Sequence, residues 1–324
     1  MKNLYSVAFY NLENLFDTVN DSKVMDDDFT PGTQMDWSAA RYSKKLNELG
    51  RIISQIGYKE TNHPPVIIGV AEVENETVLK DLVSTKFLKS EGYGYIHFDS
   101  PDERGIDTAL IYRKKYFKIL YKEAITLLVY NEEGIRDYTR DILYVKGKLE
   151  DEIIHILINH WPSRREGTEI TTPKRMAAAL KNREIISKIK AENPLEKIIV
   201  MGDFNDNPTN ESLKTLADTD FYNPMEMLLT KYSGSLNYQS TWNLFDQIII
   251  SNSFLQQYKN SFQFEKARIF NPKELKEHEG KFKGNPFRTY AGPHYLGGVS
   301  DHFPVFAVFS VKKNNTLNSE KSLA

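Results

Sequence analysis

Short apolar runs rich in β-branched residues recur along nearly the whole chain. They include "SVAFY" at 6–10, "VIIGVAEV" at 66–73, "TALIYR" at 108–113, "IIHILIN" at 153–159, "IIVM" at 198–201 and "QIIIS" at 247–251. Runs of this length and composition, separated by turn-forming residues, are typical of buried β-strands. The chain is therefore expected to fold around β-sheets that are covered by a few helices.

Two longer segments have the apolar spacing of a helix instead. Residues 38–57 have apolar side chains at steps of three and four residues, which predicts one buried helix face made of Leu46, Leu49, Ile52, Ile53 and Ile56. A second helix is predicted from Lys174 to Lys190, with Pro173 in its first turn and Thr171 or Thr172 as its N-cap.

The chain reads as one domain. It has 324 residues, of which 40% are hydrophobic, so it can bury a substantial core. It has no internal repeat and no linker between two cores, which predicts a single domain over residues 1–311. Residues 312–324 are polar and are expected to form a disordered tail. The segment from Asn271 to Val299, rich in Gly and Pro, is expected to be a long loop of the kind that is usually functional or mobile.

Charge and cysteine content exclude several classes of site. Basic and acidic residues are nearly balanced, 42 against 44, which argues against a strong nonspecific hold on nucleic acid or on an anionic membrane. The absence of cysteine excludes disulfides, thiolate metal sites and a cysteine nucleophile. No run has the length of a signal peptide or of a membrane span, so a cytoplasmic location without a membrane partner is expected, unless a leader was removed.

Acids, amides and histidines stand where the apolar runs begin or end. They are Asn11, Glu13, Glu72, Asp107, His160, Asp203, Asn205, Asp246, Asp301 and His302. Packed sheets would bring these strand ends to one rim, and carboxylates, amides and imidazoles without thiolates suit a hard cation such as Mg²⁺ or Mn²⁺. Each residue also has an ordinary structural explanation, because Asp and Asn are common in turns and a lone His beside Trp is more often structural.

The order and spacing of the motifs favour the functional explanation. The motifs "FYNLENLF", "GVAEVEN", "RGIDTALIYR", "NHWPSR", "MGDFND", "FDQIIIS" and "VSDHFPVF" resemble those of the endonuclease/exonuclease/phosphatase superfamily, also called the deoxyribonuclease-I-like fold. The resemblance extends from about Leu4 to Phe309. It implies an α/β fold, a four-layer sandwich of two packed mixed β-sheets flanked by helices, with the active site at one rim.

The resemblance also implies roles at the metal and at the attacking water. Glu72 is the expected principal metal ligand, Asn11 supports the metal shell, and Asp301 is a further carboxylate linked to the metal. Asp203 is expected to position and deprotonate the water, and Asn205 to orient the water or the phosphate. Asp203 and Asn205 are two residues apart, so they lie on the same side of an extended chain.

Two histidines complete the site that the resemblance implies. His302 is expected to hydrogen-bond a phosphate oxygen, with Asp246 fixing and charging its imidazole. His160 is a candidate to protonate the leaving oxygen, and Asp107 is its expected orienting carboxylate.

Four arginines are available to hold phosphate. Arg104 and Arg140 are the preferred candidates for substrate binding, Arg164 follows, and Arg175 is available as well. Arg binds phosphate with two parallel hydrogen bonds, although on a surface of balanced charge it is more often solvated or salt-bridged.

The leading functional hypothesis is a metal-dependent phosphodiesterase acting on DNA or RNA, because two histidines flank the acids as in the deoxyribonuclease-like branch. A phosphatase or phosphodiesterase of small or lipid phosphoesters is the alternative, since the net charge of −2 is unlike a protein that tracks duplex DNA. A catalytically silent scaffold is disfavoured because the core motif positions all carry suitable residues. The expected partner is a phosphoester substrate, with nucleic acid first, and no obligate protein partner is evident.

The Asn271 to Val299 loop leads directly into Asp301, so it is expected to overhang the site. Its Lys, Arg, Phe and Tyr residues fit stacking on a base and clamping a phosphate. The same aromatic residues fit a structural role that fastens the loop to the core, and this is the favoured explanation.

Overall fold

The computed structural model describes residues 2–256 and 261–312. Residues 313–324 of the predicted tail lie outside the described part. Lys312, placed in the tail by the sequence analysis, is the last residue of strand β18.

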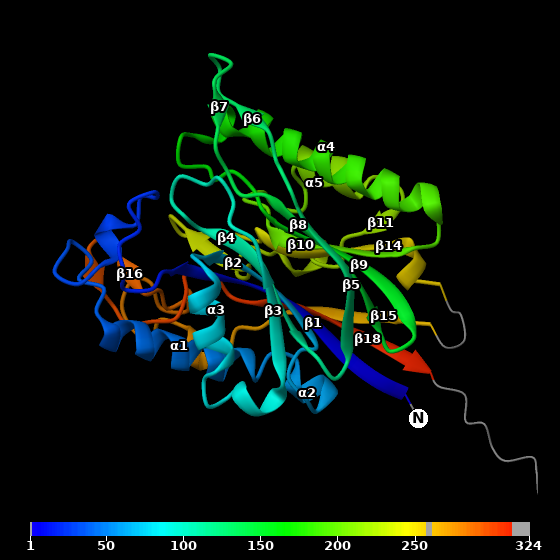
Figure 1. The fold of residues 1–324 in the computed structure, drawn as a ribbon, viewed down its shortest axis with the longest axis horizontal. Helices are drawn as coiled ribbons and strands as arrows, with labels where there is room; N and C mark the ends of the chain where they lie inside the picture. The colour runs from blue at the N-terminus through cyan, green and yellow to red at the C-terminus, as the bar shows by residue number, and fades with distance from the viewer. Residues whose placement is uncertain (1, 257–260, 313–324) are drawn as a thin grey trace, which may run out of the picture.

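Two six-stranded sheets form the centre of the molecule (Figure 1). The first has the order β15-β18-β1-β2-β4-β3. Its strands, in that order, are β15 (Gln263–Ile269), β18 (Val305–Lys312), β1 (Lys2–Leu15), β2 (Ile67–Val73), β4 (Asp107–Arg113) and β3 (Tyr93–His97). The β1–β2 pair is parallel and all other neighbouring strands of this sheet are antiparallel, so the sheet is mixed.

The second sheet repeats this plan. Its order is β11-β14-β10-β9-β8-β5, with one parallel pair, β9 and β10, near the middle. The strands are β11 (Phe221–Tyr222), β14 (Asp246–Ser251), β10 (Lys197–Asp203), β9 (Glu152–His160), β8 (Ile142–Leu149) and β5 (Phe117–Ile125).

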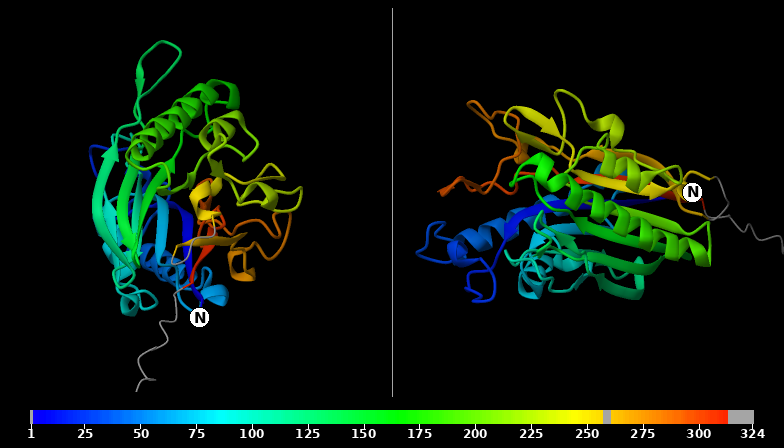
Figure 2. Two further views of the ribbon diagram at one scale, coloured as in Figure 1. Left: turned by 90° about the vertical axis from the view of Figure 1, so that its right-hand side faces the viewer. Right: turned by 90° about the horizontal axis from the view of Figure 1, so that it is seen from above.

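Helices cover the outer face of each sheet, which gives the predicted four layers (Figures 1 and 2). The helices α1 (Ala39–Ile53), α2 (Tyr58–Thr61) and α3 (Glu76–Val83) lie against the first sheet, and α4 (Thr168–Glu192) and α5 (Glu211–Ala217) lie against the second. None of the described helices combines a membrane-spanning length with sufficient apolar character.

The remaining elements are short. They are the hairpins β6 (Val129–Tyr130) with β7 (Arg136–Asp137), β12 (Leu236–Tyr238) with β13 (Thr241–Asn243) and β16 (Tyr290–Ala291) with β17 (His294–Tyr295), and the 3₁₀ turns η1 (Asp27–Phe29), η2 (Lys89–Glu91), η3 (Glu226–Leu228), η4 (Asn252–Phe254) and η5 (Lys273–Leu275).

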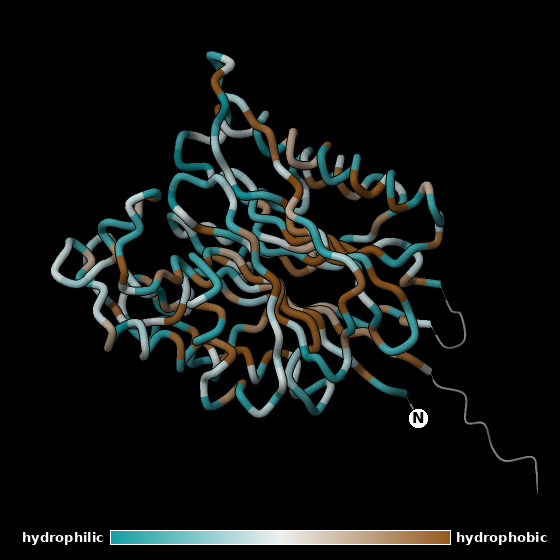
Figure 3. The backbone as a smooth tube through the Cα atoms, viewed as in Figure 1, coloured by the Kyte–Doolittle hydropathy of each residue, from teal (hydrophilic) through white to brown (hydrophobic). Residues whose placement is uncertain are grey.

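Burial on both faces explains why the central strands read as continuous apolar runs. In β1, Val7 and Phe9 enter the core between the two sheets, whereas Ala8 and Tyr10 enter the core under the helices. Figure 3 shows that apolar residues are concentrated in the central strands. Gly69 of β2 allows the sheets to approach, because a Cβ there would lie 2.8 Å from Sδ of Met201 in the opposite sheet.

The prediction for the second long helix was wrong at its start. Helix α4 begins at Thr168, so Pro173 lies inside the helix and neither Thr171 nor Thr172 is the N-cap. Instead, Oγ1 of Thr171 donates to the carbonyl of Gly167 at 2.7 Å. Buried Arg175 donates to hydroxyls and a carbonyl of this first segment, which stabilises helical turns ahead of the proline.

Candidate active site

The strand ends named by the sequence analysis meet at one end of the two sheets. In the second sheet, Asp203 at the end of β10 lies opposite His160 of β9 on one side and opposite Asp246 of β14 on the other. In the first sheet, Asn11 of β1 pairs with Ala71, the residue before Glu72. Hydrogen bonds between Asn11 and the acids join the two groups across the sandwich.

Gly202 makes the approach of β9 and β10 possible. A Cβ at this position would lie 2.3 Å from the backbone oxygen of Asn159, so any other residue would push the strands apart. After Asp203 the chain turns through Asn205, whose φ of 50° lies in the left-handed region that Asn tolerates. This local geometry places Asp203 at the mouth of a buried strand.

Asp203 is held by both asparagines of the site. Its Oδ2 accepts from Nδ2 of Asn11 at 3.0 Å, and its Oδ1 accepts from the backbone N–H of Asn205 at 3.0 Å. The side-chain Nδ2 of Asn205 donates to the carbonyl of Trp161 at 3.0 Å. Burial raises the pKa of Asp203 to about 6, and the nearby Asp246 adds to this increase. A carboxylate with such a pKa is well suited to accept a proton near neutral pH.

His302 and Asp246 form a buried ion pair beside Asp203. Nδ1 of His302 donates to Oδ2 of Asp246 at 2.7 Å, and Nε2 lies 3.9 Å from Oδ2 of Asp203. Burial alone would lower the pKa of His302, but the Asp246 and Asp203 carboxylates raise it well above its ordinary value. The two carboxylates therefore favour the protonated imidazole, whose Nε2 is directed toward Asp203.

Glu72 is the second acid that Asn11 contacts, after Asp203. Its Oε2 accepts from the backbone N–H of Asn14 at 2.8 Å, and its Oε1 accepts from Nδ2 of Asn11 at 3.4 Å. Burial raises its pKa, but Arg104 and His302 outweigh this effect, so the pKa lies below the ordinary value and Glu72 is ionised. Its φ of 60° is unusual for a residue with a side chain, and such strain is typical of functional sites.

Asp301 lies at the rim of the site. Its Oδ2 accepts from Nη2 of Arg288 at 2.8 Å, and its Oδ1 lies 3.9 Å from Nε2 of His302. Arg288 also approaches Glu13, with its Nε 3.6 Å from Oε1 of the acid. Arg288 therefore joins the expected metal carboxylate Asp301 to a second acid.

Glu13 and Lys45 belong to this end of the molecule but received no role from the sequence. Oε2 of Glu13 accepts from the backbone N–H of Thr289 at 2.7 Å, and Nζ of Lys45 donates to the carbonyl of Glu13 and to Oγ1 of Thr289. Burial raises the pKa of Glu13 to about 7. The sequence gives only weak indications of these two residues: Glu13 follows Asn11 by two residues in the same strand, and Lys45 lies on the apolar face of α1.

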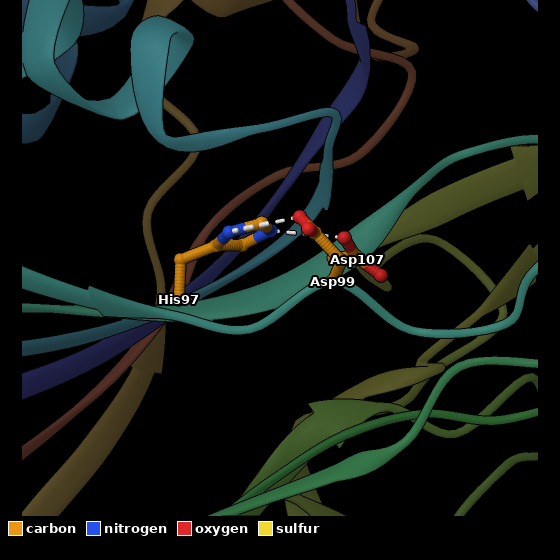
Figure 4. Close-up of side chains that lie close together, drawn as sticks. All are labelled: His97, Asp99 and Asp107. Atoms are coloured by element: carbon orange, nitrogen blue, oxygen red, sulfur yellow. Dashed lines mark hydrogen bonds and ion pairs between the residues drawn. The ribbon is translucent and has the colours of Figure 1, made fainter.

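The structure corrects the predicted partner of His160. Asp107 accepts from Nε2 of His97 at 2.9 Å (Figure 4) and from the backbone N–H of Ser100. It does not orient His160. His97 lies on the strand next to Asp107, which explains the pairing. Nδ1 of His160 has no hydrogen-bond partner among the described residues, and its Nε2 lies 3.9 Å from both Glu72 and Asp203. His160 is thus in the site, whereas Asp107 supports the adjacent strand.

The imidazole of His97 also approaches Asp99, with Nδ1 3.8 Å from Oδ1 (Figure 4). The donor atoms of His97, Asp99 and Asp107 lie close enough together to hold a metal ion. The two ring nitrogens, however, face different carboxylates, and Nε2 is already hydrogen-bonded. This group is therefore a hydrogen-bonded His97–Asp107 pair with the Asp99 carboxylate nearby, and no metal is assigned to it.

Two of the three arginines expected to bind substrate are held by internal contacts. Arg140 is buried, with Nη1 2.9 Å from Asp102 and Nη2 donating to the carbonyl of Trp161 at 2.7 Å. Nε of Arg164 donates to the carbonyl of Asn205, and its Nη2 lies 2.6 Å from Asp206. These contacts stabilise the strand ends, and substrate binding by Arg140 and Arg164 stays a prediction.

Arg104 remains in a position to meet a substrate. Its Nη2 donates to Oδ1 of Asn14 at 2.5 Å and lies 4.0 Å from Oε2 of Glu72. The side chain is partly exposed and lines a pocket next to the acids. Arg165 and Arg288, which the sequence analysis did not select, line the same pocket.

The donor groups fit a divalent cation. Ligand atoms of Asp203, Asp246 and His302 lie within 4.8 Å of one another, and Glu72 is joined to Asp203 through Asn11. Within this group, Nδ1 of His302 is engaged by Oδ2 of Asp246, and Oδ1 of Asp246 has no hydrogen-bond partner among the described residues. Several buried acids at one strand end repel one another, and a bound cation offsets that repulsion.

Comparisons with known proteins identify the family and the fold of the chain. Residues 6–312 match the Endonuclease/Exonuclease/phosphatase family. No curated protein sequence matches the chain significantly. The fold is similar to that of an endonuclease/exonuclease/phosphatase family protein from Bacteroides thetaiotaomicron, with a TM-score of 0.56, 18% identity and 96% of each chain covered.

Two further solved structures illustrate the range of the fold. A mannosyl-6-phosphatase from Bacteroides thetaiotaomicron has a TM-score of 0.56 and 19% identity, with 94% of this chain and 99% of that chain covered. TDP2 from D. rerio, complexed with a single-strand DNA product, has a TM-score of 0.57 and 14% identity, with 94% and 98% covered. The match over nearly the whole chain confirms the resemblance seen in the motifs, and the chain belongs to the Endonuclease/Exonuclease/phosphatase family.

Proposed function

We propose that this protein hydrolyses phosphoesters with the help of a divalent cation, and that Asp203 activates the attacking water. One observation carries the proposal: the buried Asp203 carboxylate, oriented by Asn11 and Asn205, stands 3.9 Å from Nε2 of a His302 that Asp246 holds. A base and a cationic hydrogen-bond donor thus face the same small volume.

The reaction follows from these positions. Asp203 takes a proton from water as the water oxygen bonds to phosphorus, and the bond between phosphorus and the leaving oxygen breaks. His302 donates a hydrogen bond from Nε2 to a phosphate oxygen, where negative charge develops. Asn205, held by the Trp161 carbonyl, keeps the Asp203 carboxylate in place. The leaving oxygen gains a proton from a nearby donor or from water.

Glu72 and Asp301 would hold the cation, with Asn11 between Glu72 and Asp203 as a support. When bound, Mg²⁺ or Mn²⁺ would supply positive charge to the phosphate oxygens. Oδ1 of Asn11 already accepts from the backbone N–H of Glu13 at 2.9 Å, which favours a supporting role over that of a principal ligand. His160 as the acid for the leaving oxygen stays a prediction, and it has no orienting carboxylate in this structure.

A phosphodiester of DNA or RNA is the first substrate class to test. Its support is the pair of histidines beside the acids, together with the fold shared with TDP2 bound to a single-strand DNA product. A small phosphoester is the second candidate, and the pocket beside Glu72 specifically favours it. The cytoplasmic location expected from the sequence stays a prediction.

A substrate panel decides between the classes. Purified protein is assayed with Mg²⁺, with Mn²⁺ and with EDTA on supercoiled plasmid, single-stranded oligonucleotides, bis-(p-nitrophenyl) phosphate and p-nitrophenyl phosphate. Cation-dependent hydrolysis of at least one ester is expected. A folded protein that hydrolyses no phosphoester with either cation would overturn the proposal.

A further inference from the structure

A pocket of about 400 Å³ opens beside the proposed metal carboxylates. It lies between the 17–37 loop and the 276–299 loop, which run side by side at the strand-end side of the molecule (Figures 1 and 2). Arg104 and Arg288 line the pocket and also contact the site, since Arg104 lies 4.0 Å from Glu72 and Arg288 lies 2.8 Å from Asp301. A group attached to the reacting phosphate can therefore enter this pocket.

One wall of the pocket is apolar and already packed. It is formed by Met25, Phe29, Met35, Trp37 and Tyr290. The ring of Tyr290 contacts the rings of Phe29 and Trp37, with centroids 6.2 and 6.0 Å apart, and its hydroxyl donates to the carbonyl of Met35 at 2.9 Å. Such a preformed wall suits the flat face of a ring at a low entropic cost.

A second wall of the pocket is cationic. Arg104, Arg165 and Arg288 line it, and the guanidinium of Arg165 has no ion-pair or hydrogen-bond partner within residues 2–256 and 261–312. Glu13 is the acid of the lining, and it is buried and held by Thr289 and Arg288. The positive charge at the pocket thus exceeds what the protein itself neutralises, and Arg is well suited to bind phosphate.

We infer that the site acts on a compact phosphoester that carries a ring and a second anionic group, of the nucleoside bisphosphate type. The ring lies in the pocket against Met25, Phe29 and Met35, which are backed by the buried Trp37 and Tyr290, and Arg165 and Arg288 bind the second anion. The inference rests on the proposed function, because the reacting phosphate is assigned to the Asp203 site. The same ring and anionic groups occur in a free small molecule and in the terminal nucleotide of a nucleic-acid strand.

Binding tests the pocket independently of catalysis. Isothermal titration calorimetry compares thymidine 3′,5′-bisphosphate, thymidine and inorganic phosphate. The bisphosphate is expected to bind at least about tenfold more tightly than either fragment, since one ligand then uses both walls. Met25→Glu places a negative charge on an exposed pocket residue, and Met227→Glu makes the same change at an exposed residue outside the pocket lining.

The expected result is a loss of about tenfold or more in bisphosphate affinity for Met25→Glu and for Arg165→Ala, with Met227→Glu within twofold of the unsubstituted protein. Equal affinity for the bisphosphate and inorganic phosphate, or unchanged affinity in both pocket variants, would overturn the inference. Competition by a 3′-phosphorylated oligonucleotide, as effective as the free bisphosphate, would identify a strand end as the source. Competition by the free compound alone would identify a small molecule.

Two esters with the same leaving group separate this inference from the proposed function. Thymidine 3′-phosphate 5′-(p-nitrophenyl phosphate) is expected to exceed methyl p-nitrophenyl phosphate in kcat/KM, and Met25→Glu is expected to reduce that ratio. Equal hydrolysis of both esters, unaffected by Met25→Glu, would contradict the pocket inference and keep the proposed function. Tight binding of the bisphosphate, without hydrolysis of either ester or of any ester in the panel, would contradict the proposed function and keep the pocket.

Discussion

His302 donates from Nδ1 to Oδ2 of Asp246 at 2.7 Å, and both residues are buried. The two come from different parts of the chain, since Asp246 begins β14 of the second sheet and His302 precedes β18 of the first. The contact therefore joins the sheets at the end where Asp203 lies. Because Nδ1 of His302 is hydrogen-bonded to Asp246, Nε2 is the ring nitrogen that faces Asp203.

Asp246→Asn is expected to lower kcat by about 10²-fold with a smaller effect on KM. The amide keeps the shape of the side chain but removes the charge that stabilises the His302 cation, and electrostatic stabilisation of the developing charge is lost. Steady-state kinetics measure the effect, with circular dichroism to verify the fold. Asp99→Asn, beside His97 and largely exposed, is the matched control and should retain full activity. Equal activity of the two variants would show that the ion pair has no catalytic role.

Glu72→Gln is expected to weaken Mn²⁺ binding by at least about tenfold, since a neutral amide replaces the charged ligand. Calorimetric titration with Mn²⁺ measures this loss. Glu76→Gln, at the exposed start of α3, is the control with the same chemical change. Undiminished affinity in Glu72→Gln would mean that the cation is held elsewhere.

Arg175→Met is expected to destabilise the fold by about 3 kcal/mol, because it removes the more deeply buried of the two cations that contact buried Asp206, 2.9 Å away. Arg164 also contacts Asp206, but it is only partly buried. Urea unfolding measures the loss. Arg183→Met breaks a partly exposed ion pair with Asp220 and should cost at most about 1 kcal/mol. If Arg175→Met loses no more stability than Arg183→Met, the Arg175–Asp206 ion pair does not stabilise the fold as expected.

The free energy of unfolding is expected to fall as the pH decreases below about 6.5, partly through His155. Burial lowers the pKa of His155 from its ordinary value of 6.5, so the unfolded chain binds a proton that the folded chain resists. Acid therefore favours the unfolded state, and the contribution is lost on lowering the pH. His155→Gln should show a smaller decrease than the unsubstituted protein between pH 7.5 and 5.5, whereas His294→Gln, at an exposed site, should follow the unsubstituted curve. Parallel curves for all three proteins would exclude His155 as the cause.

The rim of acids was predictable because strand periodicity and chain direction place strand ends together. Asp203, for instance, follows the apolar run "IIVM" and is separated by one residue from Asn205, and the structure shows both at the mouth of β10. The four layers followed from the family resemblance, since the apolar runs alone are compatible with other α/β folds. Continuous runs such as 198–201 predict buried strands, and the structure confirms this by placing β10 between two cores.

The partners of individual side chains were not predictable. Glu13 meets Thr289 across nearly the whole chain, and no local pattern reports such a contact. Asp107 pairs with His97 because β3 and β4 are adjacent and antiparallel, a register that the sequence alone does not specify. In the 271–299 loop, Tyr290 is buried against Trp37, in agreement with the structural role, whereas substrate binding by the loop stays a prediction.

The central claim is that Asp203 is the base, and the single-turnover rate of Asp203→Asn tests it most directly. The amide keeps the hydrogen-bonding shape but cannot take the proton of water. With the best ester of the panel and saturating Mg²⁺ or Mn²⁺, the rate is expected to fall by about 10³-fold or more while the unfolding midpoint changes little. A folded Asp203→Asn variant that turns over within tenfold of the unsubstituted protein would contradict the account.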